Sequence, residues 1–227
     1  MRRCVVVRLV LLAVFASSTA AADSLPRGFE EVPGSRSADR TLGAIWPDAE
    51  HVIDSVPQNQ LVELGRGRVI ATLGSETVFA HQNHAMPAPR WTRDGSFVWY
   101  VDGKWGSLAL EVVRIERGKV SWQLDVRERV VAEVVKSVQR AVPRAAAIAK
   151  QHGEGDGRWY REGLAIEVRP TNQTFPLTFE VELTSDPKCL EDYPKAGQFA
   201  YRTTARLDAA GALVVEALRA RARRCGM

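Results

Sequence analysis

The chain has 227 residues, with 31 lysines and arginines against 27 aspartates and glutamates and a formal net charge of +4. Residues 1–22 combine two leading arginines, an apolar run from Leu9 to Ala16 and small residues at Ala20 and Ala22, which predicts a secretory signal peptide. Removing 22 of the 227 residues, and with them three of the 31 basic side chains, leaves 205 residues with 28 basic against 27 acidic ones. This balance, together with export, excludes a globally basic nucleic-acid-binding protein.

We therefore predict a periplasmic or secreted protein. No later stretch is long and apolar enough to predict a transmembrane segment. Residues 23–40 are rich in Pro, Gly, Ser and charge, and we expect a flexible lead-in there. Two cysteines follow the signal peptide, Cys189 and Cys225. An even pair in an exported chain predicts one disulfide, with free thiols as the alternative.

Residues 41–124 predict a β-rich N-terminal part. Its first stretch, Thr41–Gln60, carries apolar residues between prolines and predicts a short helix or irregular cover. Short strands with Asp-Gly turns between them follow. The clearest pattern is a hairpin that joins Ser107–Glu116 to Lys119–Leu124 at Arg117-Gly118.

The stretch from Asp125 to Gln151 has apolar residues at three- and four-residue spacing, which predicts one long helix. Asp125 with Glu128 three residues later predicts its N-terminal cap. Pro143 lacks an amide proton, so we expect a bend near that residue. The alternative is a second short helix that starts at Pro143.

Residues 125–227 are predicted to hold this helix and a four-stranded antiparallel sheet. Alternating apolar and polar residues mark strands near Leu164–Arg169, Leu177–Thr184 and Phe199–Leu207. Leu213–Arg223 is built from good helix formers, but we favour a strand that pairs Tyr201 with Leu218 and Ala205 with Val214. This register places Glu216 on the apolar face.

The predicted fold class is α+β, with antiparallel sheets packed on one long, proline-bent central helix. A C-terminal antiparallel meander is stapled by the Cys189–Cys225 disulfide. No Pro/Gly-rich linker separates the meander from residues 41–124, so the two parts can form one continuous domain.

Four aromatic residues between positions 91 and 105 are the first candidate binding site: Trp91, Trp99, Tyr100 and Trp105. Aspartates flank them, and exposed aromatic rings beside carboxylates suit a glycan or an extended protein partner. The alternative is that these rings belong to a core.

A second candidate is His81, His84 and Met86. Imidazole and thioether ligands suit copper, and this cluster predicts a periplasmic copper-binding protein. The alternative is surface histidines and a packing methionine.

A third candidate is an arginine stripe on the polar face of the last hairpin: Arg202, Arg206, Arg219, Arg221 and Arg223. It could bind an anionic envelope polymer or a lipid head group. The alternative is a ladder of salt bridges with Glu180 and Glu182 on the neighbouring strand.

The sequence carries no catalytic motif for hydrolysis, phosphate binding or dinucleotide binding. We name no catalytic residue and lean towards a chain that is not an enzyme. The leading hypothesis is an exported binding or accessory protein of the cell envelope, with an envelope protein or glycan as partner. The alternatives are copper binding and a small envelope hydrolase. Glu180 and Glu182 have a spacing that overlaps that of glycosidase carboxylates, but two glutamates on a wet strand face are ordinary for a solvated surface.

Overall fold

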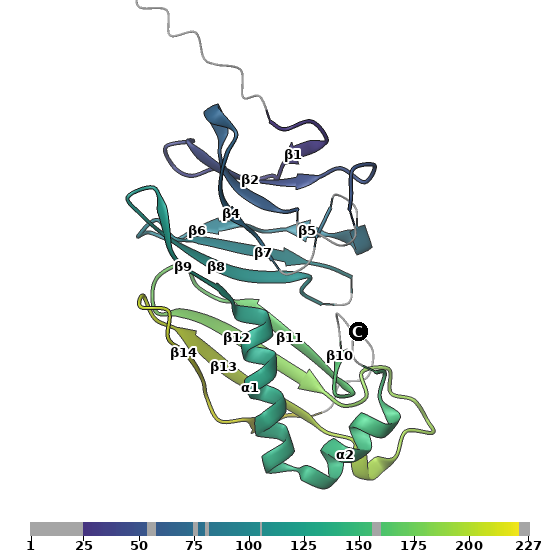
Figure 1. The fold of residues 1–227 in the computed structure, drawn as a ribbon. Coiled ribbons are helices and arrows are strands. Elements are labelled where there is room, and N and C mark those ends of the chain that lie inside the picture. The colour runs from purple at the N-terminus through teal and green to yellow at the C-terminus, as the bar shows by residue number, and fades with distance from the viewer. Residues whose placement is uncertain are drawn as a thin grey trace, which may run out of the picture.

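The computed structural model describes residues 25–53, 58–74, 77–79, 82–104, 106–155 and 160–222. These residues form three antiparallel sheets and two helices, and the sheets follow one another along the molecule (Figure 1). The predicted signal peptide, His81, Trp105, Arg223 and Cys225 lie outside the described residues. Among the helices that are described, none has the length and apolar character needed to cross a membrane.

The N-terminal sheet has four strands in the order β1-β2-β3-β4, and a 3-10 turn, η1, follows β3. Two of its strands correct the sequence analysis, because β2 lies where a short helix or irregular cover is predicted and β1 lies in the predicted lead-in. The strands and the turn are β1 (Phe29–Glu31), β2 (Leu42–Pro47), β3 (Gln60–Glu63), η1 (Leu64–Arg66) and β4 (Arg68–Thr72).

The middle sheet has the strand order β5-β7-β8-β9, and β6 also pairs with β7. The predicted hairpin is confirmed as β8 and β9, with Arg117 and Gly118 both at positive φ, as a tight two-residue turn requires. The elements of this part are the 3-10 turn η2 (Gln82–His84), β5 (Met86–Pro87), β6 (Arg90–Trp91), β7 (Phe97–Asp102), β8 (Ala109–Glu116) and β9 (Lys119–Asp125).

The central strands of the middle sheet, β7 and β8, are buried on both faces over most of their length. Phe97, Trp99 and Val101 of β7 belong to a core shared with the N-terminal sheet. Val98 and Tyr100, which alternate with them, belong to a second core shared with the helices and the C-terminal sheet. β7 and β8 therefore hold all the layers of the molecule together.

The helices are α1 (Val126–Ala141) and α2 (Pro143–His152). Asp125 is the N-cap as predicted, and its carboxylate accepts the Glu128 amide hydrogen bond at 2.8 Å. Val142 leaves the helical region at φ −141° and ψ 62°, and Pro143 starts the new helix. The prediction of one long central helix is therefore wrong, and the alternative of a second helix starting at Pro143 is what the structure has.

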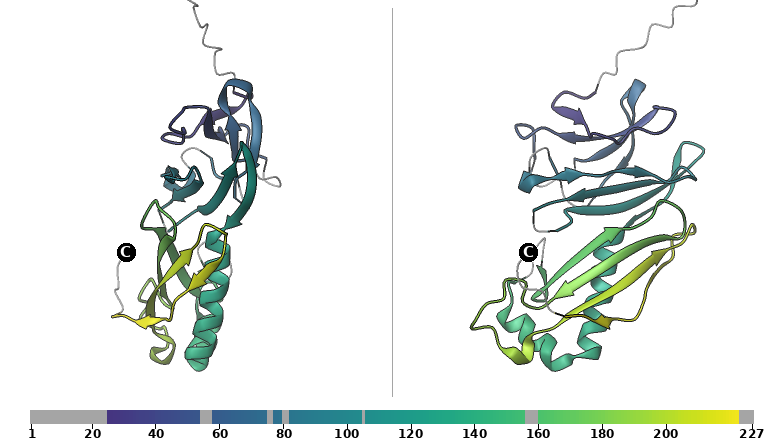
Figure 2. Two further views of the ribbon diagram at one scale, coloured as in Figure 1. Left: turned by 90° about the vertical axis from the view of Figure 1, so that its left-hand side faces the viewer. Right: turned by 180° about the vertical axis from the view of Figure 1, so that it is seen from behind.

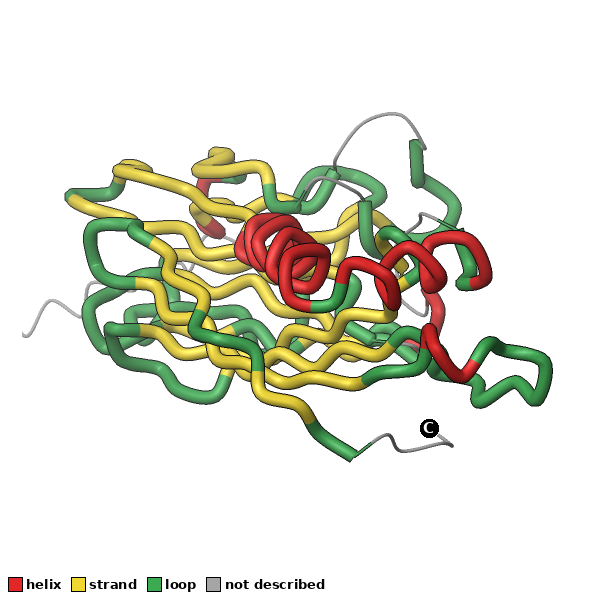
Figure 3. Tube along the Cα trace, turned by 90° about the horizontal axis from the view of Figure 1, so that it is seen from below, coloured by secondary structure: helices red, strands yellow, loops and turns green. Residues whose placement is uncertain are grey.

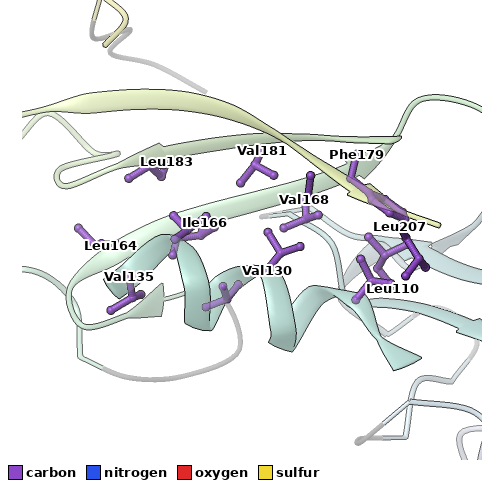
Figure 4. Close-up of a cluster of buried hydrophobic side chains, with 14 of the residues drawn as sticks. Leu110, Val130, Val135, Leu164, Ile166, Val168, Phe179, Val181, Leu183 and Leu207 are labelled. Carbon is purple, nitrogen blue, oxygen red and sulfur yellow. The ribbon is translucent and has the colours of Figure 1, made fainter. Parts of the chain in front are cut away.

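The C-terminal sheet has the order β10-β11-β12-β13-β14, with β15 also paired to β13. Its apolar face packs on α1, and valines and leucines from both layers meet there (Figure 4). The strands, with a 3-10 turn, are β10 (Tyr160–Arg161), β11 (Leu164–Pro170), β12 (Leu177–Thr184), η3 (Lys195–Gly197), β13 (Ala200–Leu207), β14 (Leu213–Val215) and β15 (Arg219–Ala220).

The predicted last strand is a strand and not a helix, but it is interrupted and its register differs. Ala205 pairs with Val215, one residue after the predicted Val214. Tyr201 pairs with Ala220, two residues after the predicted Leu218. A shift of one residue exchanges the faces of a strand. Val214 is accordingly 63% exposed instead of buried.

The predicted fold class is corrected in two ways. The chain is mostly antiparallel sheet, and in place of a central helix α1 lies on one face of the C-terminal sheet while α2 lies at its end beside η3 (Figures 1 and 3). The C-terminal sheet is larger than the predicted four-stranded meander. The predicted disulfide between Cys189 and Cys225 involves a residue, Cys225, that lies outside the described residues.

A buried carboxylate joins the middle sheet to the N-terminal sheet. Glu111 of β8 is 6% exposed and accepts hydrogen bonds from the Gly74 amide at 2.5 Å and the Gln123 side chain at 2.9 Å. Gln123 also donates to the Thr72 carbonyl at the end of β4. Burial raises the pKa of Glu111, the two hydrogen bonds lower it, and the carboxylate of Asp125 raises it further.

We expect Glu111→Gln to change how stability depends on pH. Because the folded pKa is raised, the stability linked to this group is complete below its ordinary value of 4.5 and is lost as pH rises through the folded value. The variant lacks this loss, so its unfolding free energy should rise relative to the unmodified protein as the pH rises above 4.5.

Urea denaturation across this range measures the difference. Glu180→Gln, at an exposed position on the C-terminal sheet, is the matched control and should lack this trend. A difference between Glu111→Gln and the unmodified protein that stays constant with pH would contradict the assignment.

Candidate functional site

The predicted aromatic site is divided between two cores and one surface. Trp99 is fully buried between the N-terminal and middle sheets, whereas Tyr100 points into the other core. Trp91 is half-buried, lies 5.0 Å from the Phe97 ring and donates its indole hydrogen bond to the Ser35 carbonyl at 2.8 Å. Trp105 lies outside the described residues. The structure therefore does not bring Trp91, Trp99 and Tyr100 together on one surface.

The predicted copper ligands lie at the edge of the middle sheet. His84 ends η2 at φ 57°, and Met86, at the start of β5, is 57% exposed. His81 lies outside the described residues, and among those that are described no group of three His, Cys, Asp or Glu side chains could hold a metal ion. Copper binding stays a prediction that rests on His84 and Met86.

A small, partly open pocket lies between the end of α2 and the loop after β12. Its volume is about 30 Å³, which is room for about one water molecule. Buried Asp186 and Tyr193 line it, together with His152 and Tyr160. Burial raises the pKa of Tyr160, and the neighbouring Glu154 raises it further. The size of the pocket makes it part of the packing of this corner.

The strongest concentration of charge lies on the face of the C-terminal sheet that points away from the helices. The alternation that buries Val168 and Val181 against α1 places the charged residues of the same strands on the opposite face. We call this surface the charged sheet face. Its charged residues are Glu167, Arg169, Glu180, Glu182, Arg202, Arg206, Glu216, Arg219 and Arg221.

One row of this face has an unusual order of charges. Glu167 lies opposite Glu182, Glu182 lies opposite Arg202, and Arg202 lies opposite Arg219. Two carboxylates are thus neighbours at one end of the row and two guanidinium groups at the other. Like charges directly opposite one another on neighbouring strands destabilise a sheet.

The carboxylate end of the row is neutralised by additional arginines. Arg169 forms an ion pair with Glu167, and Arg221 forms one with Glu182. Burial raises the pKa of Glu167. The charge of Arg169 lowers this pKa, and the carboxylates of Asp102 and Glu182 raise it. The sequence predicts a salt-bridge ladder between the arginine stripe and Glu180 and Glu182. The ion pair of Arg221 with Glu182 is one part of that ladder.

The guanidinium end has no such compensation. Arg202 and Arg219 are both exposed, and the described part of the chain places no carboxylate in an ion pair with either. Arg206, one step along β13, is paired with Glu216 at 2.8 Å. Arg202 and Arg219 are therefore two adjacent cations without an ion pair, on a face that carries five arginines and four glutamates.

Tyr100 reaches the edge of this face from the middle sheet. Burial raises the pKa of Tyr100 to about 12, with further contributions from Asp102 and Glu167, while Arg169 lowers it. The residue predicted as an aromatic contact is therefore a buried phenol beside the charged row. Its place beside Glu167 and Arg169 follows from the packing of β7 near β11, for which the sequence has no local signal.

Glu216 resolves a difficulty in the predicted register. The Thr203 hydroxyl donates to the Glu216 carbonyl at 2.8 Å, and the Glu216 amide donates to the Thr204 carbonyl at 2.9 Å. The carboxylate lies with Arg206 on the charged sheet face. The predicted position of Glu216 on the apolar face is wrong because the register is shifted.

Comparison with known proteins gives no match: no family model, no curated protein and no solved structure is similar to the chain.

We expect Trp99→Ala to destabilise the protein by about 3–5 kcal/mol, because it leaves a large cavity between the N-terminal and middle sheets. Trp99→Phe should cost much less. Within the described residues the buried indole nitrogen has no hydrogen-bond partner, so the smaller ring removes an unsatisfied donor as well as packing contacts.

Urea denaturation followed by circular dichroism measures both variants. A loss below about 1 kcal/mol for Trp99→Ala would show that the indole does not fill this core.

Proposed function

We propose that the chain is an exported, non-catalytic binding protein of the cell envelope that engages an acidic glycan through Arg202 and Arg219. Export rests on the predicted signal peptide, and a periplasmic or secreted location follows from it. The observation that carries the proposal is the uncompensated arginine pair on the charged sheet face.

The first support is energetic. Each of the three other arginines on this face has a carboxylate partner, whereas Arg202 and Arg219 oppose each other on β13 and β15. An arrangement that lowers stability without a structural benefit is typical of a functional site. An anion held between the two guanidinium groups would remove the repulsion.

The second support is the geometry of the pair. Side chains directly opposite each other on antiparallel strands have Cβ atoms about 5 Å apart, so both guanidinium groups can reach one anionic group. The planar arrangement of N–H donors in arginine matches carboxylate and sulfate groups with paired hydrogen bonds. The open face gives an extended chain access along the row.

We expect Arg202→Gln/Arg219→Gln to weaken binding of heparin, used as a sulfated glycan probe, by at least about tenfold at low salt. The same variant should change the unfolding free energy by less than about 1 kcal/mol, because it removes the repulsion between the two arginines together with the attraction between Arg202 and Glu182. Fluorescence titration measures the first effect and urea denaturation the second.

Arg206→Gln is the matched control, since it removes the same charge from the same strand but from a residue already paired with Glu216. It should alter heparin binding by less than about twofold and stability by less than about 1 kcal/mol. If the control and the double variant lose binding equally, the proposed site is wrong. The proposed site is also wrong if the double variant destabilises the protein by more than about 2 kcal/mol, because the two arginines would then be part of what holds the sheet together.

A further inference from the structure

A second charged surface lies on the outer side of α1 and is independent of the proposed glycan site. Arg129, Lys136 and Arg140 recur at spacings of seven and four residues, which places them on one line along the helix. All three are exposed. We call these three residues, together with Glu133, the basic helix face; Arg144, also exposed, belongs to α2 beyond the break at Val142.

The line of cations lies opposite the buried side of the helix. Val130, Val134 and Val138 fill the core against the C-terminal sheet, so the cations project away from the molecule. α1 lies on the outside of the fold, as the views from the side and from below show (Figures 2 and 3). The three cations of α1 span about 16 Å at the rise of an α-helix.

The face carries one carboxylate among its cations. Glu133 is bonded to Lys136 at 3.1 Å, and its pKa is lowered first by that hydrogen bond and then by the charges of Lys136, Arg129 and Arg140. The other charged side chains that join α1 and α2 to the sheet are paired: Glu128 with Arg161, and Lys150 with Glu162. The described residues place no carboxylate in an ion pair with Arg129, Arg140 or Arg144.

We infer that the basic helix face docks on the surface of an anionic lipid bilayer. The face is a straight ridge without walls, and a ridge touches a plane along its length, whereas a single polymer chain is held better by a groove. Long lysine and arginine side chains reach phosphate head groups without a precise fit. The valines of α1 stay in the core, so the contact is electrostatic and requires no unfolding of the helix.

The test is co-sedimentation of the mature protein with vesicles of phosphatidylcholine, alone or mixed with phosphatidylglycerol. Binding is expected only with phosphatidylglycerol and should weaken as salt is raised. Each cation near the surface contributes about a fivefold change, so Arg129→Gln/Lys136→Gln/Arg140→Gln should lower the partition coefficient about a hundredfold.

Glu133→Gln provides a test in the opposite direction, because it removes the only carboxylate of the face and should strengthen vesicle binding about fivefold. The variant Arg117→Gln/Lys119→Gln removes two exposed cations at the turn between β8 and β9, outside both proposed sites, and as the control should bind vesicles like the unmodified protein. Equal binding to both kinds of vesicle would overturn the inference. So would a triple variant that keeps vesicle binding, or one that loses heparin binding instead, since a polymer would then be the ligand of the helix.

Discussion

The burial of β7 and β8 on both faces is the constraint on which the rest of the structure depends. The side chains of β7 alternate between two cores, so the N-terminal sheet and the helix layer are attached to the same strand from opposite sides. A strand in this position has a nearly continuous apolar sequence, which is why FVWYV shows no alternation. Glu111 is the one charged side chain of β7 and β8 that is buried, and it is tolerated because Gly74 after β4 and Gln123 of β9 supply its hydrogen bonds.

This constraint also explains why the aromatic cluster of the sequence is not a cluster in space. Trp99 and Tyr100 are neighbours in the chain, and the period of a strand sends them to opposite faces. Both are needed as large apolar side chains that fill two different interfaces. Aromatic residues close in sequence therefore indicate a binding surface only when the strand that carries them has one face in water.

The alternation of apolar and polar residues in the sequence predicted the strands that have one face in water and one face buried. The alternation in β11, β12 and β13 and the hairpin of β8 and β9 are where the sequence predicts them, because the sheet edge and the turn residues determine them locally. The predicted long helix is divided at Val142, and Pro143 begins the second helix. Such a break needs only one non-helical residue, which the 3.6-residue spacing of the apolar side chains does not reveal. The register of β14 and β15 depends on the hydrogen bond between Thr203 and Glu216, and no local signal predicts that contact.

The charged residues show the same division between local and tertiary information. The arginines of the last hairpin could be placed on one face from their spacing, but which of them are neutralised depends on the strand on the other side of β13 and on the true register. The structure leaves Arg202 and Arg219 as the uncompensated pair. Sequence spacing treats these arginines as equivalent, whereas in the described part of the chain the ion pairs of Arg206 and Arg221 distinguish them from Arg202 and Arg219.

The two positive surfaces of the C-terminal part point in opposite directions, since α1 covers one face of the sheet and its cations project away from that face. Occupation of one surface therefore leaves the other accessible. A chain with a nearly balanced total charge gains little from long-range attraction, so both contacts depend on where the unpaired cations lie and not on net charge. Screening acts over about 8 Å at physiological ionic strength, which is less than the thickness of a helix packed on a sheet. The helix side and the sheet side are thus electrostatically separate, and a substitution on one should leave the anion affinity of the other unchanged.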